Sequence, residues 1–111
     1  MIRVFALYFE PDSADLPSAA PTVIGAAADR ALAGHAVHIS VVGYADAAEG
    51  RGDPQGLSER RARAVAAALV ALGVPAAIIG AEGHGRSEPA VPTPDGVAEP
   101  LNRRASIALS F

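Results

Sequence analysis

A strand that leads into a charge-rich helix is the feature that most constrains how this chain can fold. Residues 37–43 alternate apolar and polar side chains with the two-residue period of a half-buried strand. The pattern breaks at Gly43, and a lone carboxylate, Asp46, follows just beyond the strand end. Apolar residues then recur at helical spacing over residues 62–72. The chain therefore predicts a β-strand joined by a loop to a helix that packs on the same sheet.

The rest of the chain supplies three further strands and one further helix. Residues 4–9 predict the first strand, and a helix that is capped by Ser18 and ended by Gly34 follows it. Short apolar runs predict the last two strands, and the segments between strands and helices are rich in glycine and proline. We expect strands at 76–81 and 105–111, irregular loops at 47–56 and 86–101, and Ser58 as the N-cap of the second helix.

The order strand, helix, strand, helix, strand, strand predicts an α/β (α+β) sandwich. Its sheet is mixed and four-stranded, and both helices pack on one face. At 111 residues the chain is long enough for one core, so we expect a single domain over residues 1–111. Alanine supplies much of the apolar half of the composition, which predicts a thin interior with helices close to the sheet.

Charge and cysteine content exclude several classes of function. The net charge is -3 with both signs interspersed, which gives no electrostatic drive toward nucleic acid. The sequence has no cysteine, and therefore no disulfide, thiolate nucleophile or cysteine zinc site. The N-terminus lacks the pattern of a secretory signal, and no apolar segment is as long as a bilayer span, so we expect the chain as given to be soluble. We also expect no cofactor.

Asp46 and Arg61 are the candidate poles of a binding site. With a helix that begins at Ser58, Arg61 falls near the helix start, one turn before Val65, and borders the buried face. Arg103 has the parity of the buried residues of the last strand and is expected on the same face. A carboxylate, guanidinium groups and free helix N–H groups suit a zwitterion that carries an ammonium and a carboxylate.

Each residue also has an ordinary structural interpretation. Asp46 could be a turn aspartate that accepts hydrogen bonds from its own backbone. Arg61 could be a solvated helix arginine paired with Glu59 or Asp46. From the residues alone both interpretations stay open.

Four motifs in order resemble the OmpA-like peptidoglycan-binding domain, which outer-membrane protein A shares with peptidoglycan-associated lipoprotein and flagellar stator proteins. They cover residues 43–46, 55–62, 83–85 and 102–104, and residues 9–16 resemble the family's entry strand and acidic-serine loop. The resemblance implies an αβ sandwich without catalytic activity, in the periplasm or cell envelope, that binds the diaminopimelate of peptidoglycan stem peptides. A membrane-anchored or oligomeric parent would make such binding a useful tether to the outer membrane.

The family's two principal ligand contacts fall on Asp46 and Arg61 of this chain. Asp46 would hold the ammonium and Arg61 the carboxylate, with Arg103 as an outer contact. The resemblance extends the expected ligand-binding set to Ser58, Asp12 and Asn102, and it implies no metal ligand.

The chain departs from the family pattern in the loop expected to wrap the ligand. Ala45 replaces the usual threonine, Pro54 replaces an asparagine, and the glycine after the aspartate comes one place late, at Gly50. These changes leave open a weaker affinity or a modified peptide as the target. Ala45 and Pro54 also motivate an alternative function, a structural or protein-interaction domain with weakened or lost ligand binding.

Two histidine arrangements are weaker candidates. His84 with Ser87 would make the protein a small hydrolase, but no motif supplies a third catalytic group. His35 and His38 could bind a metal, but no third ligand is indicated.

Overall fold

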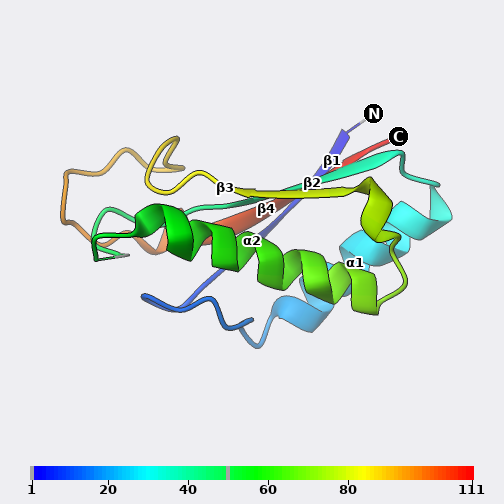
Figure 1. The fold of residues 1–111 in the computed structure, drawn as a ribbon, viewed down its shortest axis with the longest axis horizontal. Helices are drawn as coiled ribbons and strands as arrows, with labels where there is room; N and C mark the ends of the chain where they lie inside the picture. Colours follow the sequence, from blue (N-terminus) through cyan, green and yellow to red (C-terminus); the bar gives the residue numbers. More distant parts are fainter. Residues whose placement is uncertain (1, 50) are drawn as a thin grey trace.

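The computed structural model describes residues 2–49 and 51–111 and has one four-stranded sheet covered by two helices (Figure 1). Gly50, the displaced loop glycine, lies outside the described residues. The predicted α+β class and element order are confirmed. The elements are β1 (Ile2–Tyr8), α1 (Ala20–Ala33), β2 (His38–Gly43), α2 (Pro54–Ala71), β3 (Ile79–Gly83) and β4 (Arg104–Ser110), with 3-10 turns η1 (Ala76–Ile78) and η2 (Pro100–Asn102).

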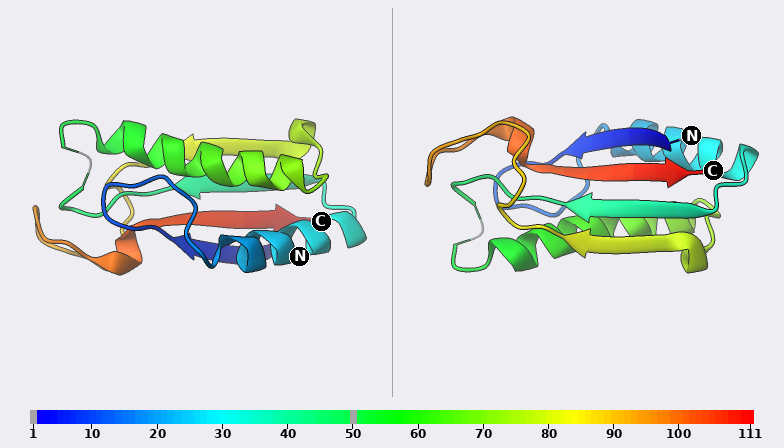
Figure 2. Two further views of the ribbon diagram at one scale, coloured as in Figure 1. Left: turned by 90° about the horizontal axis from the view of Figure 1, so that it is seen from below. Right: turned by 90° about the horizontal axis from the view of Figure 1, so that it is seen from above.

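The strands lie in the order β1-β4-β2-β3, so the last strand of the chain is inserted into the middle of the sheet. β4 runs antiparallel to both β1 and β2, whereas β2 and β3 are parallel and joined through α2. Both helices cover the same face, as predicted (Figure 2). The loops that follow β1, β2 and β3 therefore gather at one end of the domain, and the termini lie at the other (Figure 1).

The core lies between this sheet face and the helices. Along β4, Ala105, Ile107 and Leu109 are buried and alternate with partly exposed residues. The face of α1 toward the sheet is buried throughout, and it consists of Ala20, Ile24, Ala27, Ala28 and Ala31. Small alanine side chains let the helices lie close to the sheet, which matches the thin interior expected from composition.

Several predicted boundaries are wrong. In the described part of the chain no side chain caps α1, whose N-cap is Ala19 and not Ser18. The predicted strand at 76–81 begins as the η1 turn, and β3 starts only at Ile79. Pro75 explains the shift, because η1 begins directly after it and the Ile78 N–H bonds to its carbonyl.

α2 begins at Pro54, inside the predicted loop 47–56, and Ser58 is not its cap. Asp53 caps the helix by accepting a hydrogen bond from the Gly56 N–H at 2.8 Å, and proline is well tolerated in a first helical turn. Within residues 2–49 and 51–111, no helix combines the length and apolar character needed to cross a bilayer.

Glycines bring the start of α2 close to the sheet. Gly43 and Gly83 are register partners at the ends of β2 and β3. A Cβ at Gly43 would overlap the Ser58 carbonyl, and one at Gly83 would meet the Ser58 hydroxyl. This close approach buries the sheet-facing side chains of the first turns of α2, including that of Arg61.

Candidate functional site

Arg61 lies about two turns inside α2 and is fully buried, with an exposed fraction of 0%. All five of its N–H donors are used. Nε donates to the Ser13 carbonyl at 2.9 Å, Nη1 to the Tyr44 carbonyl at 2.9 Å and Nη2 to the Glu10 carbonyl at 3.2 Å. The remaining two donors bind the carboxylate of Glu49. Arg61 therefore joins the loops that follow β1 and β2.

The carboxylate of Glu49 is held by four hydrogen bonds. Arg61 Nη1 donates to Oε1 at 2.7 Å and Nη2 donates to Oε2 at 2.5 Å. The backbone N–H of Asp46 donates to Oε1 at 3.0 Å, and that of Asp12 donates to Oε2 at 2.6 Å. Asp12 has a left-handed backbone with φ 54°, which aspartate adopts more readily than most residues. The charge of Arg61 is thus neutralised inside the protein.

Asp46 is also buried and fully engaged, with 1% of its surface exposed. Its Oδ1 accepts from the Ala48 N–H at 2.9 Å, which is the self-contained turn that its sequence position also predicted. Its Oδ2 accepts from the Glu99 N–H at 3.0 Å and from Arg103 Nη1 at 3.1 Å. The long loop before β4 is thereby attached to the end of β2.

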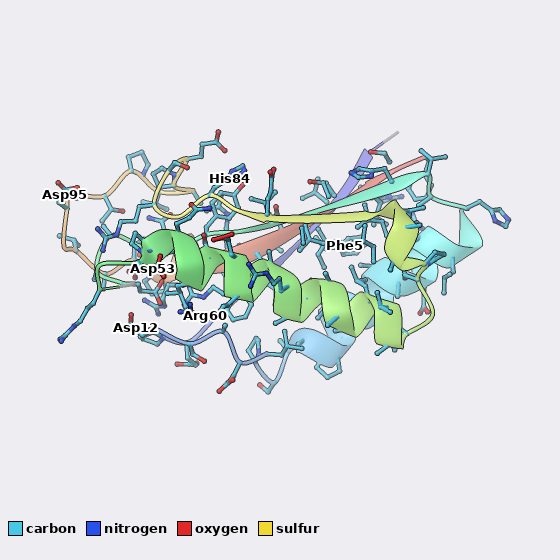
Figure 3. The ribbon with its side chains drawn as sticks, viewed as in Figure 1. Phe5, Asp12, Asp53, Arg60, His84 and Asp95 are labelled. Carbon is cyan, nitrogen blue, oxygen red and sulfur yellow. The ribbon has the colours of Figure 1, made fainter. Side chains whose placement is uncertain are left out.

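These contacts join two oppositely charged pairs into one network. Arg103 pairs with Asp46, the Asp46 N–H binds Glu49, and Glu49 pairs with Arg61. We call these four residues the charge network. It lies at the end of the domain where the loops gather, the end at which Asp12 and Asp53 are also found (Figure 3).

Asp46 and Arg61 are thus brought into one network, but neither pairs directly with the other. The alternative interpretation of Arg61, a solvated arginine paired with Glu59 or Asp46, is wrong, because Arg61 is buried and pairs with Glu49, and Glu59 pairs with the exposed Arg63. The expectation that helix N-terminal N–H groups flank Arg61 is also wrong, since the helix starts earlier. The N–H groups beside Arg61 belong instead to the loop residues Asp12 and Asp46.

The other predicted contact residues have different environments. The buried Ser58 hydroxyl donates to the Gln55 carbonyl and accepts from the Gly85 N–H, so it joins α2 to the loop after β3. The Asn102 side chain bonds to Val91 and Thr93 and folds the long loop onto itself. Asp12 reaches the charge network through its backbone. Arg103 also donates to the Phe9 carbonyl at 3.1 Å, beside the network.

Glu49 is the residue that sequence reasoning missed. It follows Asp46 in a loop without periodicity, where no pattern marks one acidic residue above another. The only signal was indirect, namely the glycine displaced to position 50, which leaves a glutamate in the place before it.

The histidine candidates do not assemble a catalytic group in the described residues. The His84 ring nitrogens lie 3.1 Å from Glu82 and 3.3 Å from Glu88, both exposed. The Ser87 hydroxyl donates to the His84 carbonyl and not to its ring. His35 and His38 belong to no cluster of three or more metal-binding side chains among the described residues.

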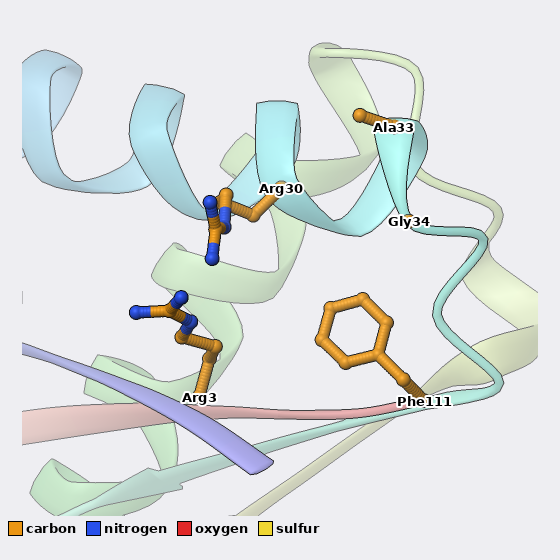
Figure 4. Close-up of a pocket in the computed structure, with 5 residues that line it drawn as sticks. All are labelled: Arg3, Arg30, Ala33, Gly34 and Phe111. Carbon is orange, nitrogen blue, oxygen red and sulfur yellow. The ribbon is translucent and has the colours of Figure 1, made fainter. Parts of the chain in front are cut away.

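The hollows in the described part of the chain include two that lie away from the charge network. One, of about 340 Å³, is lined by Arg3, Arg30, Ala33, Gly34 and Phe111, and its two guanidinium groups point toward one another near the termini (Figure 4). The other, of about 400 Å³, is an apolar groove that runs between the start of α1 and the end of α2. The charge network itself is closed by its own contacts.

Comparison with known proteins places this geometry in context. The sequence profile of the OmpA family matches residues 8–103. An outer membrane protein of Gluconacetobacter diazotrophicus is 35% identical over an alignment of 113 positions, which covers 96% of this chain and 30% of the relative. The chain thus spans less than a third of that relative's length.

Solved structures share the fold. The peptidoglycan-associated lipoprotein of Burkholderia pseudomallei is 26% identical with a TM-score of 0.85, over 96% of this chain and 90% of that one. The OmpA-like domain of FopA1 from Francisella tularensis has the same TM-score of 0.85 at 23% identity, over 96% of this chain and 71% of that one, which is a likeness of fold.

Proposed function

The chain belongs to the OmpA family, and from that premise we propose that it is a non-catalytic module that binds the stem peptides of peptidoglycan. The ligand group would be the free end of diaminopimelate, which carries an ammonium and a carboxylate. Arg61 would hold the carboxylate and Asp46 would face the ammonium, with Arg103 beside it.

The observation that supports this proposal is the bidentate ion pair between Arg61 and the carboxylate of Glu49. Nη1 binds one oxygen of Glu49 and Nη2 binds the other, and two backbone N–H groups complete the site. This is the arrangement by which a guanidinium recognises a carboxylate with defined orientation. A ligand carboxylate would find the same donors if it took the place of the Glu49 side chain.

The proposed binding is weak and reversible. Charge-assisted hydrogen bonds contribute about 1.5–3 kcal/mol each before the cost of ordering the partners. A longer parent protein in the cell envelope, periplasmic or anchored in the outer membrane, would convert such contacts into a tether through effective concentration.

A second candidate function is a structural or protein-interaction domain without ligand. The observation that favours it is the complete internal pairing of both poles, Asp46 with Arg103 and Arg61 with Glu49. In that case the charge network only joins the loops of the domain.

Titration of labelled protein with a diaminopimelate-containing muropeptide separates the two candidates. Binding in the site predicts amide shifts at Asp46, Asp12 and Tyr44, whereas unchanged spectra favour the structural domain. Retention on cell-wall sacculi, competed by free diaminopimelate, is the companion assay. Arg61→Lys should lose retention, and Arg60→Lys, at the exposed neighbouring position, should keep it.

A further inference from the structure

We propose that Glu49 is an internal ligand of the Arg61 site, so that an outside carboxylate binds only by displacing the Glu49 side chain. The identity of the outside ligand rests on the proposed function, but the occupancy of the site by Glu49 does not. The inference assigns to this chain a built-in competitor for its own binding site.

The donors around Glu49 form a receptor for one carboxylate. Two of them come from the Arg61 guanidinium, and the other two are the backbone N–H groups of Asp12 and Asp46, which belong to different loops. Each oxygen accepts one guanidinium N–H and one backbone N–H. The hydrogen-bond geometry of this receptor does not require that the carboxylate belong to the same chain.

The guanidinium of this receptor is held in place without the help of Glu49. The other three donors of Arg61 bind the main-chain carbonyls of Glu10, Ser13 and Tyr44. The Phe9 ring lies 5.1 Å from the Arg61 guanidinium carbon and supports it through a cation–π contact. When the Glu49 side chain leaves, the guanidinium therefore keeps its position, and such preorganisation favours an incoming carboxylate.

The side chain of Glu49 can move while its backbone remains anchored. The Glu49 carbonyl accepts a hydrogen bond from Arg86 Nη2 at 2.6 Å, and its N–H donates to the Asp46 carbonyl at 3.3 Å. Rotation about the side-chain bonds is thus sufficient to exchange one carboxylate for another. The exchanging group stays near the site and competes at high effective concentration.

Charge explains why both carboxylates cannot be bound together. With Glu49 in place the charge network holds two cations, Arg61 and Arg103, and two anions, Glu49 and Asp46. A second carboxylate would enter a buried, neutral site whose donors are already used. Without Glu49 the network carries one excess positive charge, which attracts a carboxylate.

The first test is rescue by a small carboxylate. Thermal unfolding of Glu49→Ala is measured in sodium acetate and in sodium chloride at equal ionic strength. Acetate should raise the melting temperature of Glu49→Ala by several degrees more than that of the wild type. The control Glu59→Ala removes a solvent-accessible glutamate from the same region and should show no such excess. Equal effects of acetate on all three proteins would overturn the inference.

The second test is titration with a diaminopimelate-containing muropeptide. By the relation between apparent affinity and the fraction of open sites, Glu49→Ala should bind at least about tenfold more tightly than the wild type. Equal binding by both proteins would overturn the internal-ligand inference and keep the proposed function. Acetate rescue without muropeptide binding by either protein would support the internal ligand and reject the proposed function.

If Glu49→Ala does not fold in chloride, the wild type still decides the question. Its Glu49 carboxyl carbon is followed by NMR during acetate titration, together with the amides of Asp12 and Asp46. Displacement predicts that all three signals move along one binding curve. A Glu49 signal that stays constant up to saturating acetate would contradict the inference.

Discussion

The carboxylate of Glu49 and the guanidinium of Arg61 form a bidentate ion pair, with oxygen–nitrogen distances of 2.7 and 2.5 Å. The Arg61 side chain is fully buried, and 2% of the Glu49 side chain is exposed. The pair connects the loop after β2 to α2, and the Asp12 N–H adds the loop after β1. Because both charges are buried, removal of one leaves the other uncompensated, and this determines how the domain responds to substitution.

Glu49→Ala should destabilise the folded state by about 3–5 kcal/mol, since it leaves the Arg61 charge buried without a counterion. Glu59→Ala removes the partner of Arg63 in an exposed pair 3.6 Å apart and should cost less than about 1 kcal/mol. Urea unfolding of the two variants in a chloride buffer measures both values. Similar costs for the two would show that Glu49 does not neutralise a buried Arg61 charge.

Arg61→Lys should cost about 2 kcal/mol or more. Lysine keeps the charge but offers three donors on one nitrogen, so the carbonyls of Glu10, Ser13 and Tyr44 cannot all be satisfied together with Glu49. The exposed neighbour provides the matched control, because Arg60→Lys should change the free energy of unfolding by less than about 0.5 kcal/mol. An Arg61→Lys domain of wild-type stability would refute the five-donor arrangement.

Gly43→Ala should be among the most costly single-methyl additions in the chain, about 3 kcal/mol. The new Cβ would overlap the Ser58 carbonyl, and a helix backbone cannot move aside as a side chain can. Gly25→Ala, inside α1 with no neighbouring atom within 4 Å, should instead stabilise the domain by about 0.5–1 kcal/mol. Changes in melting temperature of opposite sign for the two variants would support the close approach of α2 to the sheet. Changes of the same sign would argue against it.

Asp53→Ala should cost about 1 kcal/mol because it removes the cap of α2. Ser18→Ala should be nearly neutral, although the sequence pattern predicts a cap there. Chemical unfolding of the pair distinguishes the observed helix starts from the predicted ones. A larger loss at Ser18 than at Asp53 would contradict the observed boundaries.

The sequence predicted the fold because the core obeys simple periodicities. In β4, the buried residues Ile107 and Leu109 alternate with partly exposed ones, and in α1, Ala27, Ala28 and Ala31 recur at helical spacing. The buried faces of the strand and the helix therefore follow from spacing alone. The predicted start of α2 is wrong because Pro54, considered by itself, indicates a break in regular structure. Asp53 is the N-cap and Pro54 follows in the first turn, and this combination begins a helix.

The candidate site was only partly predictable. Asp46 and Arg61 stand at recognisable positions of a motif, whereas the partners that neutralise them come from elsewhere. The Asp12 N–H and the Glu10 carbonyl reach Arg61 and Glu49 only when β1 pairs with β4, a contact between the two ends of the chain. A local sequence pattern does not indicate which distant residues become neighbours in the fold. A glutamate in an irregular loop also follows no periodicity that would indicate its partner.

A structure of the wild-type domain bound to a diaminopimelate-containing muropeptide tests the central claim most directly. The account predicts that a ligand carboxylate binds Arg61 Nη1 and Nη2 together with the Asp12 and Asp46 N–H groups, and that the Glu49 side chain is turned out of the site. A bound muropeptide elsewhere on the domain, with the Glu49–Arg61 ion pair intact, would contradict it.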